Sequence, residues 1–75
     1  MNKQRRKEIT EATRRIEEIV EKIQQILSDE QEAYDNMPEG IQSSERGINS
    51  ESAQECLEAA IDSLEDAIAS LEEVE

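Results

Sequence analysis

The chain of 75 residues contains no His, Trp or Phe, and only one Cys, one Pro and one Tyr. Without His, with a lone Cys and without a Gly-rich phosphate loop, the usual nucleophile–base pairs cannot be assembled, so we expect no enzyme. The lack of His also removes a ligand that di-metal helical bundles require, and we expect neither a metal nor a cofactor. Cys56 has no partner for an intramolecular disulfide, and we interpret it as a half-buried thiol.

Long apolar runs are also missing. No stretch of about 20 apolar residues exists, so we expect no membrane span. Alternation of apolar and polar residues at a period of two is absent, which argues against strands. The basic N-terminus is interrupted by Glu8 and Glu11 instead of leading into an apolar segment, so we expect no secretory signal and a cytoplasmic location.

Basic residues are scarce and unevenly placed within a net charge of −12. Residues 1–22 hold seven basic and five acidic residues, a net +2, whereas residues 23–75 hold one basic and fifteen acidic residues, a net −14. Such an acidic surface disfavours nucleic acid and anionic membranes and favours basic proteins, including those that normally bind nucleic acid. The alternative interpretation is a solvated face that keeps the protein soluble.

What the chain does have is a heptad repeat. Leu57, Leu64 and Leu71 recur every seven residues, each followed by apolar residues at the spacing of a helix face. The first half carries a wider apolar stripe on a helix of residues 2–35. Its innermost rows are Ile9, Ala12, Ile16, Ile19, Ile23 and Ile26, and an adjoining row adds Val20, Leu27 and Tyr34.

The stripes break only around Pro38 and Gly40, so we predict a turn at 36–43. Asn36 and Glu39 have the spacing of a capping box, which would start a brief turn of helix carrying Ile41. The second helix begins between Ser43 and Ser50. We favour the early start, a helix of 44–75, although it places Gly47 inside the helix.

These elements predict one all-α domain of residues 1–75, an antiparallel two-helix hairpin that resembles a coiled coil. Folded at residues 41–42, the innermost rows pair as Ile9/Val74, Ala12/Leu71, Ile16/Ala67, Ile19/Leu64, Ile23/Ala60 and Ile26/Leu57. The layers nearest the turn, Glu30/Ala53 and Ala33/Ser50, are weak. Lys3–Lys7 and Glu72–Glu75 would lie side by side and neutralise each other.

A hairpin of this size buries little apolar surface, and one apolar row on each helix would remain uncovered. Two hairpins packed as a four-helix bundle would cover these rows, and so would the groove of another protein. We therefore predict a homo-oligomer, most simply a homodimer. Its predicted interface is Val20, Leu27, Ile61 and Ile68.

Two surfaces are candidates for binding a protein partner. The second helix carries acids spaced along a rigid rod, which can imitate a phosphate backbone: Glu55, Glu58, Asp62, Glu65 and Asp66. The turn carries Tyr34, Met37, Ile41 and Ile48. The basic segment Lys3–Lys7 followed by heptads has the outline of a basic-zipper DNA-binding protein. Its basic tract is short and interrupted by acids, so we do not expect direct binding of nucleic acid.

The segment from Ser28 to Gly47, followed by the repeats at Leu57 and Leu64, resembles a group of small acidic helical proteins of phages and prophages of Gram-positive bacteria. The resemblance implies a phage origin, a place in the host cell cytoplasm and a role in phage–host conflict, and it supplies no functional residues. We expect an inhibitor that blocks a host or phage protein through the acidic face or the turn. The alternative is a self-assembling structural module.

Overall fold

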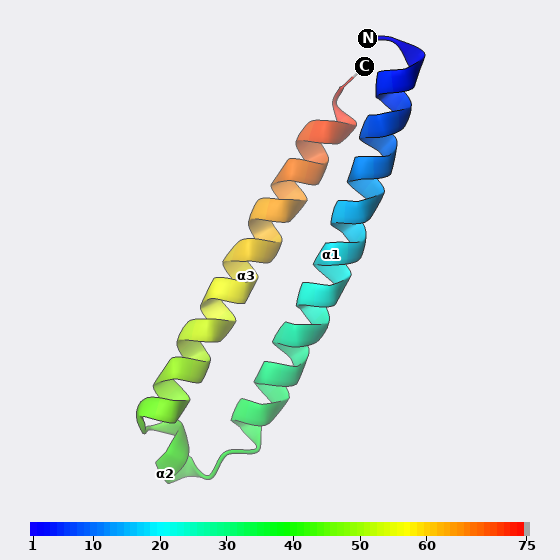
Figure 1. Cartoon of the computed structure of the whole chain (residues 1–75). Helices are drawn as coiled ribbons and strands as arrows, with labels where there is room; N and C mark the ends of the chain where they lie inside the picture. The colour runs from blue at the N-terminus through cyan, green and yellow to red at the C-terminus, as the bar shows by residue number, and fades with distance from the viewer. Residues whose placement is uncertain (75) are drawn as a thin grey trace.

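The computed structural model describes residues 1–74, and its secondary structure over that range is entirely helical. Helix α1 spans Lys3–Asp35, α2 spans Glu39–Gln42 and α3 spans Glu45–Glu72. Helices α1 and α3 run antiparallel side by side, with α2 at one end and both termini at the other (Figure 1). The molecule is a rod of 58 × 14 × 12 Å. The prediction of an all-α chain is confirmed for the described residues.

Both ends of α1 follow from local chemistry. Asn2 has extended backbone angles, and its side-chain Oδ1 accepts a hydrogen bond of 2.8 Å from the Arg5 amide, so it caps the helix. At the other end the amide of Asn36 donates to the carbonyl of Glu32 at 3.0 Å and the amide of Met37 donates to the carbonyl of Tyr34 at 3.0 Å, which closes the last turn. The predicted helix of 2–35 therefore differs from α1 only at Asn2.

The predicted turn at 36–43 contains the short helix α2. Pro38, with its fixed φ of −58°, stands at the N-cap position, and Asn36 serves as the C-cap of α1 instead of forming a capping box with Glu39. The side chain of Gln42 donates a hydrogen bond of 2.9 Å to the carbonyl of Tyr34. This bond ties α2 to the end of α1.

Helix α3 takes the early start, with Ser44 as its N-cap residue. The Ser44 hydroxyl does not cap an amide; it donates to the carbonyl of Ile41 instead. Gly47 is buried, and a Cβ atom there would lie 1.9 Å from the carbonyl oxygen of Gln42. Glycine inside α3 is therefore what allows α2 to lie directly on the first turns of α3. The end of the predicted helix at Glu75 lies outside the described residues.

The two long helices meet along a seam, which we define by the buried and half-buried residues that recur alternately three and four positions apart. Val20 and Ile61, each 7% exposed, are its most buried apolar members. The side chains facing each other across the seam bury the apolar surface that holds the pair together. The seam comprises Ile9, Thr13, Ile16, Val20, Ile23, Leu27, Glu30 and Tyr34 on α1, and Gly47, Ser50, Gln54, Leu57, Ile61, Leu64, Ile68 and Leu71 on α3.

The predicted pairing of rows across the seam is wrong. Ile19 and Ile26 are 51% and 44% exposed. Their row, with Ala12 on α1 and Ala60 and Ala67 on α3, lies at the edge of the seam or outside it. The row that we expected to form an outer oligomer interface takes its place. That row is Val20, Leu27, Ile61 and Ile68.

Helix α3 explains this choice of rows. Turning its alanine row inward would bury Ala60 and Ala67, whereas the observed rotation buries Ile61 and half-buries Ile68. Each Ile carries three more carbon atoms than Ala, and burying one CH₂ group stabilises a fold by about 0.8 kcal/mol. On α3, the observed rotation therefore buries more apolar surface than the predicted one would.

The seam becomes polar toward α2. The Ser50 hydroxyl, on a residue only 5% exposed, donates to the Glu30 carboxylate at 2.5 Å, and the side-chain amide of Gln54 donates to Ser50 Oγ at 3.3 Å. One turn further on, the hydroxyl of Tyr34 donates to the carboxylate of Glu51 at 2.5 Å. The layers predicted to be weak are thus occupied by polar side chains that bind one another across the two helices.

Ion pairs contribute little. Within residues 1–74 the one ion pair shorter than 4.0 Å joins Arg15 to Glu11 at 3.1 Å, and their four-residue spacing suits such a pair on a helix. Glu18 and Lys22 have the same spacing, but no ion pair joins them in that range. The basic start of α1 and the acidic end of α3 lie at the same end of the rod (Figure 1), but no described side chain of Lys3–Lys7 pairs with one there.

Candidate interaction surfaces

One side of the helix pair is apolar and open to solvent. Ile19 directly precedes the seam residue Val20, and Ala60 directly precedes Ile61, so both rows are rotated from the seam in the same sense. All members of the two rows are exposed except Ala60, which is half-buried. In antiparallel helices, rows rotated in the same sense fall on the same side of the pair. We call this surface the open apolar face. It consists of Ala12, Ile19, Ile26 and Ala33 on α1 and Ala53, Ala60 and Ala67 on α3.

The edges of the open apolar face differ between the two helices. Next to it on α3 lies a row of small uncharged residues, and next to it on α1 lies a charged row. Cys56 belongs to the uncharged row and is exposed, so our interpretation of it as a half-buried thiol is wrong. The uncharged row is Asn49, Cys56, Ser63 and Ser70, and the charged row is Glu8, Arg15, Lys22 and Asp29.

The acids proposed as a binding face gather on the side of α3 away from the open apolar face. All five are exposed, and seven-residue spacing places Glu58 with Glu65 and Glu55 with Asp62 in adjacent rows. Asp66 lies on the next row round the helix. The structure therefore brings these five carboxylates together on one solvent-facing arc of α3, separated from the open apolar face by the seam on one side and by the uncharged row on the other.

The predicted turn residues do not share one environment. Ile41 and Ile48 are 36% and 60% exposed, whereas Tyr34 and Met37 are half-buried. The hydrogen bond that Tyr34 donates to Glu51 raises the pKa of the tyrosine above its ordinary value, and desolvation and the charges of Glu51 and Asp35 act in the same direction. Tyr34 therefore serves as a link between α1 and α3, and only Ile41 and Ile48 are left as apolar groups free to contact another molecule.

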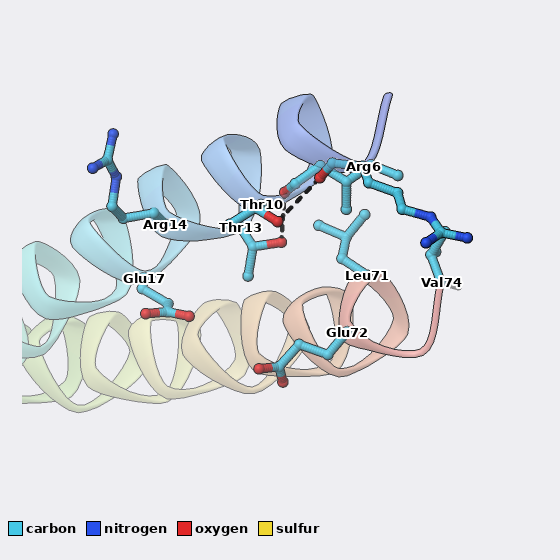
Figure 2. A pocket seen from close by; sticks show the side chains of 9 residues that line it. Arg6, Thr10, Thr13, Arg14, Glu17, Leu71, Glu72 and Val74 are labelled. Atoms are coloured by element: carbon cyan, nitrogen blue, oxygen red, sulfur yellow. Dashed lines mark hydrogen bonds between the residues drawn. The ribbon is translucent and has the colours of Figure 1, made fainter. Parts of the chain in front are cut away.

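A shallow groove of about 520 Å³ lies between the two helices near the chain termini (Figure 2). Its rim carries charges of both signs, from Arg6 and Arg14 on α1 and Glu72 on α3. Its two hydroxyls are already engaged, since Thr10 donates to the carbonyl of Arg6 at 3.0 Å and Thr13 to that of Ile9 at 2.8 Å. The groove thus offers apolar walls and a mixed rim, and no paired acid and base or nucleophile and base.

The described residues contain no group of three or more His, Cys, Asp or Glu side chains placed to hold a metal ion. No helix within residues 1–74 is long and apolar enough to cross a membrane. Comparison with known proteins adds no assignment: no family model, no curated protein and no solved structure matches the chain. The surfaces themselves are therefore the basis for any functional conclusion.

Reasoning from the sequence expected one uncovered apolar row on each helix, because both helices carry three apolar rows and a pair of helices encloses two rows from each. It assigned the wrong row, since it placed Ile19 and Ile26 inside the hairpin. On α3, leaving a row out of the seam forfeits the least burial of apolar surface when its side chains are the smallest. That row is Ala53, Ala60 and Ala67.

Proposed function

We propose that this chain is a self-assembling helical module, an antiparallel two-helix hairpin whose open apolar face packs against the same face of a second hairpin to give a four-helix bundle. The proposal rests on one observation. The hairpin already has a complete seam, yet large side chains such as Ile19 and Ile26 remain exposed on a single face beside rows of alanine. An apolar face left over on a helix pair is the surface by which such pairs associate.

The shapes of the two rows support association. The α1 row presents the branched side chains of Ile19 and Ile26, and the α3 row presents methyl groups at Ala53, Ala60 and Ala67. Large residues facing small ones allow helices to interdigitate at native density. The module then acts as a scaffold, because its product is a rigid bundle carrying outward-facing acids on both sides.

Sedimentation equilibrium of the purified chain tests the proposal. We expect a mass of twice 8.5 kDa at micromolar concentration. Replacing Ile19→Glu together with Ile26→Glu places two charges on the open apolar face, which should give a helical monomer. A matched control, Ile41→Glu with Ile48→Glu, adds the same charge at two exposed isoleucines near α2 and should stay dimeric. A monomeric parent chain, or equal behaviour of the two variants, would overturn the proposal.

A second candidate function uses the acidic arc of α3, and its support is the exposure of all five carboxylates with no basic residue among them. For this second function, the protein is an inhibitor of phage origin that blocks a host or phage protein. The blocked protein is one that normally binds nucleic acid. The resemblance of Ser28–Gly47 to small acidic phage proteins supports it. Assembly through the open apolar face leaves the arc free, so the two functions are compatible.

The inhibitor function predicts a complex that weakens as salt rises, because exposed charge pairs are screened. Replacing Glu58, Asp62, Glu65 and Asp66 by Lys should abolish binding to a basic partner, while replacing Ile41 and Ile48 by Ser tests the turn separately. Retention of every partner by both variants at low salt would rule this candidate out. Sedimentation of the same variants shows whether assembly is intact.

A further inference from the structure

The surface of the chain is larger than that of a compact protein of its mass. Its accessible area is 5782 Å² at 8.5 kDa. A folded globular chain of that mass exposes about 4,650 Å², so the excess is about 1,100 Å². A specific interface buries about 800 Å² on each partner. The excess is therefore enough for one interface of ordinary size, and the open apolar face is where large apolar side chains lie exposed in a row.

Charge favours one arrangement of two copies. Helix α1 carries seven basic and nine acidic residues, a net −2, whereas α3 carries one basic and eight acidic residues, a net −7. Setting α3 against α3 of a second copy would bring two strongly acidic helices together, and like charges in contact are unfavourable. Setting α1 of each copy against α3 of the other avoids that contact.

Packing favours the same arrangement. If α1 faced α1, the Ile19 and Ile26 rows would meet and hold those helices apart, while the facing alanine rows of α3 would draw the other two helices close. The layers would then splay. With α1 on α3, isoleucine faces alanine on both sides and the spacing is even.

We propose that two copies associate about a two-fold axis parallel to the helices, with Ile19 and Ile26 of each chain packed on the row Ala53, Ala60 and Ala67 of the other. This inference rests on the proposed self-assembly and adds its geometry. Both chains then point the same way, so all four termini gather at one end of the bundle. Both α2 segments gather at the other end of the bundle.

An axis perpendicular to the helices would instead put the two N-termini at opposite ends of a rod 58 Å long. Pulsed electron paramagnetic resonance separates the two cases. A spin label is attached at Lys3→Cys in a chain that also carries Cys56→Ser, which removes the native thiol. The proposed axis predicts a label-to-label distance of about 15–30 Å, given helix axes 8–10 Å apart.

A second labelled chain serves as a matched probe. Ser43→Cys, next to α2 at the far end, should give an equally short distance, since both α2 segments lie together. Distances approaching the length of the rod from both labels, in a chain that sediments as a dimer, would overturn this geometry and leave self-assembly standing. No distance at all, in a chain that sediments as a monomer, would overturn self-assembly itself. Adding Ile19→Glu and Ile26→Glu should remove the short distance.

Discussion

The carbonyl oxygen of Gln42 lies 1.9 Å from the position that a Cβ atom on residue 47 would occupy, and Gly47 leaves that position empty. Any other residue would push its side chain into the backbone of α2, which cannot rotate away as a flexible side chain would. The approach of α2 to α3 therefore depends on the absence of one carbon atom.

We predict that Gly47→Ala destabilises the protein by about 2–4 kcal/mol, because the backbone at the junction of α2 and α3 must move. Gly40→Ala is the matched control, since a Cβ atom at Gly40 meets nothing within 4 Å. Gly40 is helical, so alanine there should stabilise by about 0.5–1 kcal/mol. Urea unfolding followed by circular dichroism measures both changes. Equal and small effects would show that α2 does not rest on α3.

The seam predicts a large difference between two isoleucines of the same helix. Ile61→Ala should cost about 2–5 kcal/mol, because the side chain is only 7% exposed and its removal leaves a cavity. Ile48→Ala, at 60% exposure, should change stability by no more than about 0.5 kcal/mol. Thermal unfolding at one fixed protein concentration is the measurement. Similar losses from the two variants would mean that the seam is placed wrongly.

The polar end of the seam predicts non-additive mutations. Ser50→Ala removes the donor to the Glu30 carboxylate and should cost about 1–3 kcal/mol, because that acceptor then lies in the seam without this partner. Combining Ser50→Ala with Glu30→Leu makes the layer apolar and should restore or increase stability. A double-mutant cycle in urea provides the test. Simple addition of the two single effects would show that the hydrogen bond does not couple these positions.

Tyr34 is the only aromatic residue, so its ionisation can be followed directly by the absorbance of tyrosinate. Its hydrogen bond to Glu51 raises its pKa, which means that the folded state holds the proton more tightly than the unfolded state. The stabilisation is complete below the ordinary pKa of tyrosine and is lost as pH rises through the raised value. Glu51→Gln should lower the titration midpoint toward that of a free tyrosine. An unchanged midpoint would contradict the contact.

Much of the fold was predictable because the heptad spacing of apolar residues and the helix break at Pro38 are local signals in the sequence. The end of α1 at Asp35 follows from them, whereas for α3 the sequence allowed a start anywhere between Ser43 and Ser50, of which the early one that we favoured is observed. Which row faces inward was not predictable from one helix alone. It depends on the comparison of Ile61 with Ala60, which matters only once both helices are in place.

The surfaces divide in the same way. The exposure of the acidic arc follows from composition, since five carboxylates cannot be buried without partners. The link from Tyr34 to Glu51 joins residues seventeen positions apart and depends on how the chain reverses at α2, so no local pattern indicates it. The sequence analysis did not predict that Ile19 and Ile26 are exposed, because it assigned their row to the seam and the row of Val20 to the outer surface.

Aliphatic side chains alone distinguish poorly between registers that differ by one helical turn, since both leucine and isoleucine fill the holes of a facing helix. The contact between Ser50 and Glu30 does not survive such a shift, because moving one helix by a turn would leave the carboxylate facing another side chain. The polar layer next to α2 thus fixes the register of the two helices. It distinguishes the observed register from registers shifted by one helical turn.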